Sequence, residues 1–172
     1  HNKTPIQRQV QIVNDICAYL YEVIGTENNI YYSVENNTLG EAALMAIAQI
    51  GEENFRGIFL TEPSKPGIKR ARKGFNTTAK SKIAVCAKFK SLVEQKKIHI
   101  ASKMLISELK TFVAVGNSFE AKQGEHDDLV MSMMLAVRMT QALQNFDPDL
   151  DERMNDASDY VDPMPFIMLS GF

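Results

Sequence analysis

Residues 30–39 have the sequence IYYSVENNTL, in which a strand pattern, a turn and the start of a helix follow one another. The residues before Glu35 are mostly β-branched or aromatic, which is typical of a short strand. The strand is expected to end at Glu35, because the turn Asn36-Asn37-Thr38 follows directly. A helix rich in Ala, Leu and Met is predicted at residues 39–50. The stretch is therefore a strand–helix unit with a carboxylate at the carboxyl end of its strand.

The sequence on both sides of this unit alternates between helical and strand patterns. Apolar residues recur every three or four positions in residues 6–24, which predicts an amphipathic helix that Gly25 is placed to end. The alternation as a whole predicts an α/β protein, with a sheet flanked by helices. Further strands are expected at 55–60 and 98–100. Further helices are expected after Thr77 or Thr78, after Ser102 with Phe112 on the buried side, and at 129–143.

The composition is that of an ordinary globular protein. The chain has 172 residues, of which 45% are hydrophobic and 23% charged. Since no segment approaches the roughly 18 apolar residues of a membrane-spanning helix, we expect no membrane association. The first residue is His, so we expect a piece of a longer polypeptide. Cys17 and Cys86 lie far apart in helical patterns and are expected to be reduced thiols in a cytosolic protein.

Charge is distributed unevenly along the chain. Residues 63–103 contain 12 of the 19 basic residues and one acid, whereas residues 120–162 contain 11 of the 21 acids. We predict a domain at 1–146 followed by an acidic tail at 147–172. The basic stretch is either a solvated face or a surface that holds the phosphates of a nucleic acid. The residues assigned to DNA binding are Lys65, Lys69, Arg70, Arg72, Lys73, Lys80 and Lys82.

Three carboxylates are candidates for chemistry. Glu35 ends its strand at the edge where α/β sheets usually bind ligands. Asp127 and Asp128 open an apolar helix, whose positive end favours their ionised form. If the three meet, their oxygen atoms would select a hard cation, Mg²⁺ or Mn²⁺. The alternatives are a solvated strand end for Glu35, a helix cap for Asp127 and a helix-dipole residue for Asp128.

Several segments occur in an order that is specific. They are YYSVENNTLG at 31–40, GFNTTAKSK at 74–82, SELKTF at 107–112, FEA at 119–121 and GEHDDLVMS at 124–132. Together they resemble the nuclease domain of the large terminase subunits of tailed phages, and the T-even-like branch is the most similar. The resemblance runs from about Pro5 into the tail.

The resemblance implies a ribonuclease H-like fold and a metal-dependent endonuclease. Such an enzyme cuts concatemeric double-stranded DNA during packaging into a procapsid in the host cytoplasm, and its partners are the portal and the small terminase subunit. By motif matching, Glu35 corresponds to the second metal-binding acid and Asp128 to the third, with Asp127 as an adjacent candidate. The implied chemistry is hydrolysis assisted by two Mg²⁺ or Mn²⁺ ions about 4 Å apart.

The sequence departs from the family pattern at one point. The first catalytic Asp of the family lies on a strand upstream of a helix like that at 6–24, and no such strand precedes residue 1. We therefore expect the first strands of the sheet and the ATPase domain to be absent, and this chain alone to be inactive. The alternatives are another ribonuclease H-like nuclease, such as a junction resolvase, and a non-catalytic module that docks through the tail and the helix at 129–143.

Overall fold

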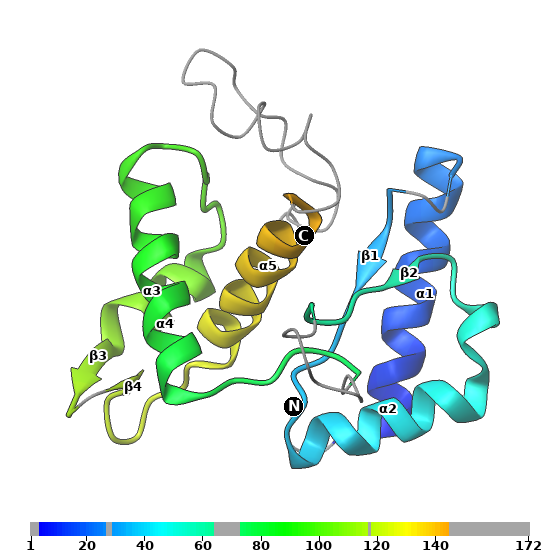
Figure 1. Cartoon of the computed structure of the whole chain (residues 1–172), viewed down its shortest axis with the longest axis horizontal. Helices are drawn as coiled ribbons and strands as arrows, with labels where there is room; N and C mark the ends of the chain where they lie inside the picture. The colour runs from blue at the N-terminus through cyan, green and yellow to red at the C-terminus, as the bar shows by residue number, and fades with distance from the viewer. Residues whose placement is uncertain (1–3, 27–28, 64–72, 117, 145–172) are drawn as a thin grey trace. The chain divides into compact units, whose positions relative to one another are not determined.

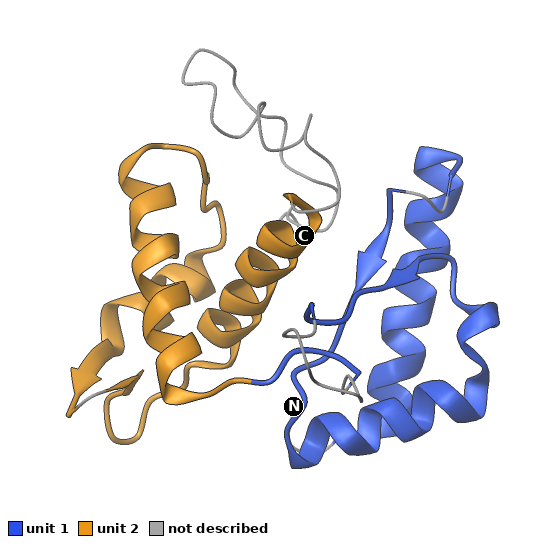
Figure 2. Cartoon of the chain, viewed as in Figure 1, with its two compact units in different colours: residues 1–76 blue, residues 77–172 orange. Residues whose placement is uncertain are grey.

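The computed structural model describes residues 4–26, 29–63, 73–116 and 118–144. The chain forms two compact units, residues 1–76 and 77–172, which are described separately (Figures 1 and 2). The expected acidic tail at 147–172 lies outside the described residues, so the division at residue 146 stays a prediction. None of the helices in the described ranges combines the length and apolarity that crossing a bilayer requires.

The first unit consists of two long helices beside a short parallel sheet (Figure 1). The bounds of both helices agree with the predicted bounds to within one residue. Gly25 ends the first of them in the left-handed conformation (φ +78°), and its N–H donates to the carbonyl of Tyr21 at 2.7 Å. The elements are α1 (Ile6–Ile24), β1 (Tyr31–Tyr32), α2 (Thr38–Ile50), the 3₁₀ turn η1 (Glu52–Asn54) and β2 (Ile58–Phe59).

The strand that ends at Glu35 makes its hydrogen bonds on one edge. β1 pairs in parallel with β2, with Tyr31 opposite Ile58. Further along, the chain forms a parallel bridge between Glu35 and Phe75. The backbone groups of every second residue in a strand point to the same side. Since these bonds come from every second residue, all of them lie on the same edge. Among the described residues, no strand pairs with the other edge of β1. The bonding residues are Ile30, Tyr32, Val34 and Asn36.

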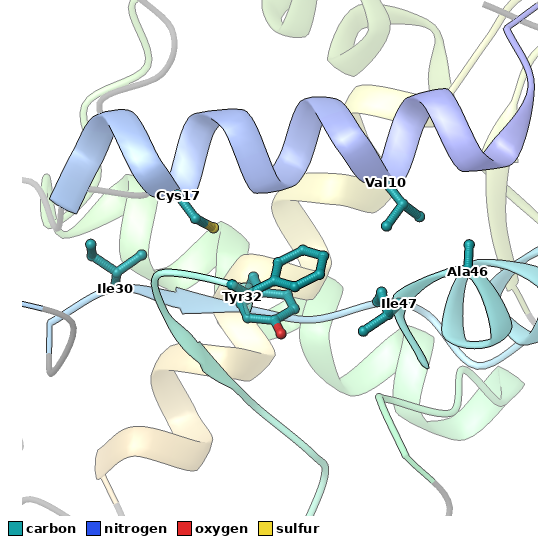
Figure 3. Packing of buried hydrophobic residues seen from close by; sticks show 7 residues of the cluster. Val10, Cys17, Ile30, Tyr32, Ala46 and Ile47 are labelled. Atoms are coloured by element: carbon teal, nitrogen blue, oxygen red, sulfur yellow. The ribbon is translucent and has the colours of Figure 1, made fainter. Parts of the chain in front are cut away.

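The core of the first unit lies between α1, α2 and the sheet. Figure 3 shows Val10 and Cys17 on α1 facing the layer that contains Tyr32 and Ile47. The ring of Tyr32 stacks on that of Phe55, with centroids 4.9 Å apart. Burial of this apolar surface fixes α1 and α2 against the strand that carries Glu35.

The described residues of the second unit form three helices and a hairpin; Figure 2 shows this unit in orange. The core of this unit lies between its helix at 79–94 and its helix at 128–144. The latter contributes Val130, Met134 and Val137, of which Val130 is fully buried. Thr78 caps the helix at 79–94 in a capping box with Ser81, and Ser102 caps the helix at 103–111, as the sequence predicts. The elements are α3 (Ala79–Glu94), α4 (Lys103–Thr111), β3 (Phe112–Val115), β4 (Ser118–Ala121) and α5 (Asp128–Gln144).

Two local predictions are wrong in this unit. Residues 98–100 are not a strand; instead Ile98 and Ile100 pack against the apolar core, which satisfies their side chains without a strand partner. Phe112 does not continue α4 but begins the antiparallel hairpin β3–β4, in which it faces Ala121. The ring of Phe112 stacks on that of Phe119, with centroids 6.1 Å apart.

Candidate functional site

Glu35 has a backbone fixed on its paired edge and a side chain that is partly exposed. The N–H of Phe75 donates to the carbonyl of Val34 at 3.0 Å, and the N–H of Asn36 donates to the carbonyl of Phe75 at 2.7 Å. Phe75 is itself buried, with 1% of its surface exposed. Glu35 therefore lies at a strand end whose backbone is held by the buried Phe75, and its role in binding a ligand stays a prediction.

The turn after Glu35 orients its carboxylate. Asn37 accepts a hydrogen bond from the N–H of Gly40 at 2.9 Å through Oδ1, and so caps α2. The Nδ2 group of the same side chain donates to Glu35 Oε2 at 3.2 Å. One amide thus links the start of the helix to the candidate acid, while Glu35 Oε1 has no hydrogen-bond partner in the part of the chain that the structure describes.

Two glycines allow the chain to approach this strand end. A Cβ atom at Gly40 would lie 1.7 Å from the carbonyl oxygen of Glu35. A Cβ atom at Gly74, where φ is +80°, would lie 2.5 Å from the carbonyl oxygen of Val34. Since both approaches are to backbone, no side-chain movement could relieve them.

The second unit places Asp127 and Asp128 at the start of α5. The carbonyl of Asp127 accepts the first helical hydrogen bond, from the N–H of Met131 at 2.8 Å. Asp127 therefore occupies the N-cap position, but its side chain does not cap the helix. Its Oδ2 atom lies 3.9 Å from Lys82 Nζ instead.

The carboxylate of Asp128 is exposed and makes no hydrogen bond or ion pair with any residue in the described ranges. The Ser132 hydroxyl donates to the Asp128 backbone carbonyl at 2.9 Å, a bond that does not involve the carboxylate. Both oxygen atoms of the side chain are thus open to a ligand.

Two of the free amides at the start of α5 are satisfied from another helix. Glu108 of α4 accepts hydrogen bonds at Oε2 from the N–H groups of Leu129 (2.8 Å) and Val130 (3.2 Å). A helix start leaves four N–H groups without internal partners, and a carboxylate there also meets the positive end of the helix dipole. Glu108 therefore performs the capping that sequence analysis offered as an alternative role for Asp127.

The predicted DNA-binding residues fall into different surroundings. Lys82 is largely covered, with 17% of its side chain exposed, and lies beside Asp127 and 5.5 Å from the ring centroid of Phe112. Lys73 forms an ion pair with Glu52. Lys80 is exposed and has no ion-pair partner among the described residues. The other four, Lys65, Lys69, Arg70 and Arg72, lie outside the described residues.

Within the described ranges, no group of three or more His, Cys, Asp and Glu side chains is close enough to hold a metal ion. Glu35 belongs to the first unit, and Asp127 and Asp128 belong to the second. The contacts of each acid are therefore those made with residues of its own unit.

Residues 9–140 match the family model of the terminase RNaseH-like domain. The chain belongs to this family. The matched region extends from α1 into α5 and includes Glu35, Asp127 and Asp128. This terminase domain is a nuclease module of the ribonuclease H-like class, with small sheets and surrounding helices, which supports a hydrolase activity in the intact protein.

Sequence reasoning missed the role of Glu108 in this terminase domain. A signal for it is present, because Glu108 lies three residues after Leu105 and four before Phe112, both of which pack against the core. An acid on the packed face of a helix needs a partner, and here the partners are backbone N–H groups.

The cysteines of the terminase domain are free, as predicted. Burial raises the pKa of the Cys17 thiol to about 11 and that of the Tyr32 hydroxyl to about 12; the charge of Glu52 adds to the latter shift. Cys17 is consequently a protonated core thiol at neutral pH and no candidate nucleophile.

Proposed function

We propose that this domain provides the acids of a metal-dependent endonuclease in a viral DNA-packaging terminase, of the T-even-like phage type, which cuts concatemeric DNA. The observation that carries the proposal is the state of the acid pair at the start of α5: the capping role is taken by Glu108, and the Asp128 carboxylate has no partner among the described residues. Adjacent acids kept out of capping are suited to binding a cation.

The donor set fits the expected cation. Glu35, Asp127 and Asp128 offer only carboxylate oxygens, which Mg²⁺ and Mn²⁺ prefer. When bound, divalent ions supply activation of the attacking water and stabilisation of the leaving 3′ oxygen. Glu35 and Asp128 would hold the ions, and Lys82 would offset part of the charge of Asp127.

The edge of β1 that has no strand partner among the described residues also supports this proposal. A two-stranded parallel sheet is uncommon, since parallel strands usually lie inside larger sheets. We propose that, in the intact terminase subunit, a strand from outside this chain pairs with that edge and carries the remaining acid. The chain would then be a piece of the nuclease domain.

The substrate and partners follow from the proposed reaction. The substrate is double-stranded DNA, whose phosphates would be held by exposed basic residues such as Lys80. The portal and the small terminase subunit would be the protein partners, and packaging would take place at the procapsid in the host cytoplasm.

The test replaces the acids in the intact terminase subunit. We expect Glu35→Gln and Asp128→Asn each to reduce plasmid cleavage to background and to weaken Mn²⁺ binding in calorimetry, while the melting temperature stays near that of the wild type. Glu125→Gln, at an exposed acid three residues before Asp128, is the matched control and should cleave normally.

Three results would contradict the proposal. Wild-type cleavage by Asp128→Asn would remove that residue from the site. A preference for four-way junctions over linear duplex would favour a junction resolvase. Absence of Mn²⁺ binding by the intact wild type would favour the non-catalytic docking module.

A further inference from the structure

The first turn of α5 is held by a side chain that is distant in sequence. Helix starts are usually capped by the residue that precedes the first helical turn, and Asp is among the preferred residues. Here Asp127 occupies that position, yet the N–H groups of Leu129 and Val130 donate to Glu108, which lies on α4.

This arrangement changes what Asp127 can do. With the amides satisfied, its carboxylate is directed to Lys82, at 3.9 Å, rather than back onto its own helix. The neighbouring carboxylate of Asp128 is likewise uninvolved in capping. The Asp127 carboxylate is thus kept out of capping because Glu108 fills that role, and the Asp128 carboxylate next to it has no partner among the described residues.

We propose that Glu108 is a positioning residue for the acid pair Asp127 and Asp128. It keeps their carboxylates available for a divalent cation by taking the N–H groups of Leu129 and Val130. This inference rests on the proposed nuclease function, but it concerns a residue that does not itself touch the cation or the DNA.

The physical consequence of removing Glu108 is specific. The N–H groups of Leu129 and Val130 would lose their acceptor, and an unpaired amide is costly when partly buried. Asp127 occupies the N-cap position and has an acceptor of the right type, so it would turn from Lys82 to cap the helix. One carboxylate would then be lost to cation binding, and the first turn that carries Asp128 would be less well ordered.

Three substitutions in the intact terminase subunit separate the contributions of Glu108. Glu108→Ala removes the acceptor. Glu108→Gln keeps an acceptor oxygen at the same reach without the charge. Glu108→Asp keeps the charge but withdraws the oxygen by one methylene, and serves if the Ala variant does not fold. Ser102→Ala is the matched control, since it removes the cap of α4 itself and leaves Glu108 in place.

Two measurements are made on each variant. Hydrogen exchange of the Leu129 and Val130 amides, without metal, reports capping. Calorimetry with Mn²⁺ reports cation affinity, which changes in residues that orient ligands typically weaken by about 10- to 100-fold. We expect Glu108→Ala and Glu108→Asp to speed exchange and to weaken Mn²⁺ binding by at least about 10-fold. Glu108→Gln should retain both properties, and Ser102→Ala should lower the melting temperature without changing affinity.

The outcomes are distinguishable. Faster exchange with unchanged Mn²⁺ affinity would overturn the positioning role and leave Glu108 a purely structural cap. Loss of affinity in a folded Glu108→Gln variant would show that the charge is needed, which overturns the capping mechanism. If the wild type binds no Mn²⁺, the proposed function fails and the role of Glu108 falls with it.

Discussion

The backbone of Gly40 lies directly against the carbonyl group of Glu35. A Cβ atom at position 40 would lie 1.7 Å from that oxygen, far inside any permitted contact. The first turn of α2 and the end of the preceding strand can approach this closely only because residue 40 has no side chain. The placement of the candidate acid thus depends on a glycine five residues later.

Gly40→Ala should therefore destabilise the protein. In an ordinary helix this change stabilises by about 1 kcal/mol. Here overpacking against the backbone should reverse the sign and cost about 1–3 kcal/mol, measured by urea denaturation. Leu39→Ala, at the adjacent and largely exposed position, is the control and should change stability by less than about 0.5 kcal/mol. A Gly40→Ala variant as stable as the wild type would show that the close approach is not required.

The two hydrogen bonds of the Asn37 side chain should have separate effects: the bond to Glu35 should affect DNA cleavage, and the bond to Gly40 should affect stability. Asn37→Asp keeps an acceptor for the N–H of Gly40 but cannot donate to Glu35, whose charge it would repel. We expect Asn37→Asp to remain close to wild-type stability while DNA cleavage by the intact subunit falls. Asn37→Ala, which also loses the cap of α2, should in addition lose about 1 kcal/mol of stability. Equal cleavage by Asn37→Asp and the wild type would mean that the bond to Glu35 has no role in orienting the acid.

Lys80 and Lys82 should differ in their effect on DNA binding. The exposed Lys80 is open to a phosphate, whereas Lys82 already faces Asp127 and Phe112. Replacing Lys80 with Ala should lower the slope of log affinity against log salt by about one. Lys82→Ala should change that slope less, because its charge is partly committed within the protein. Equal slope changes for the two variants would assign Lys82 to the DNA backbone as well.

The burial of Cys17 predicts a loss of stability at alkaline pH. Its pKa is about 11 in the folded state and 9.0 when unperturbed. Between these values the unfolded chain has released the thiol proton and the folded chain has kept it, so stability falls as pH rises from 9 to 11. The total loss from this group is on the order of 3 kcal/mol. In urea denaturation under reducing conditions, Cys17→Ala should show a flatter dependence over this range than the wild type. Parallel curves for the two proteins would mean that the thiol titrates normally in the folded state.

Much of the helical structure could be predicted from the sequence. The spacing of apolar residues located α1, α2 and α5 to within one or two residues, and the caps Thr78 and Ser102 are where hydroxyl residues precede apolar periodicity. Apolar spacing and capping residues involve neighbours within a few positions, so they can be recognised in a single sequence.

The hairpin β3–β4 was not predicted, because Phe112 continues the helical spacing of α4 and so concealed the change of period. The turn glycine, Gly116, with φ +56°, was the signal available for it. The error at Ile98 and Ile100 has the opposite origin, since a β-branched run also suits a segment that packs on a core without forming a sheet.

The candidate acids were found from residue type and position along the chain, but their surroundings were not. The bonds from Leu129 and Val130 to Glu108 join residues 21 and 22 positions apart, and the contact between Lys82 and Asp127 joins two helical segments. Such contacts arise from tertiary packing, which the periodicity of one helix does not specify.

The one-sided hydrogen bonding of β1 has a practical consequence for handling the isolated chain. Within residues 4–26, 29–63, 73–116 and 118–144, no strand pairs with the edge at Tyr31 and Ser33, and such an edge is a template on which a second molecule can add and so promote aggregation. Expression of residues 1–172 alone should accordingly give concentration-dependent aggregation, which light scattering over a dilution series would measure.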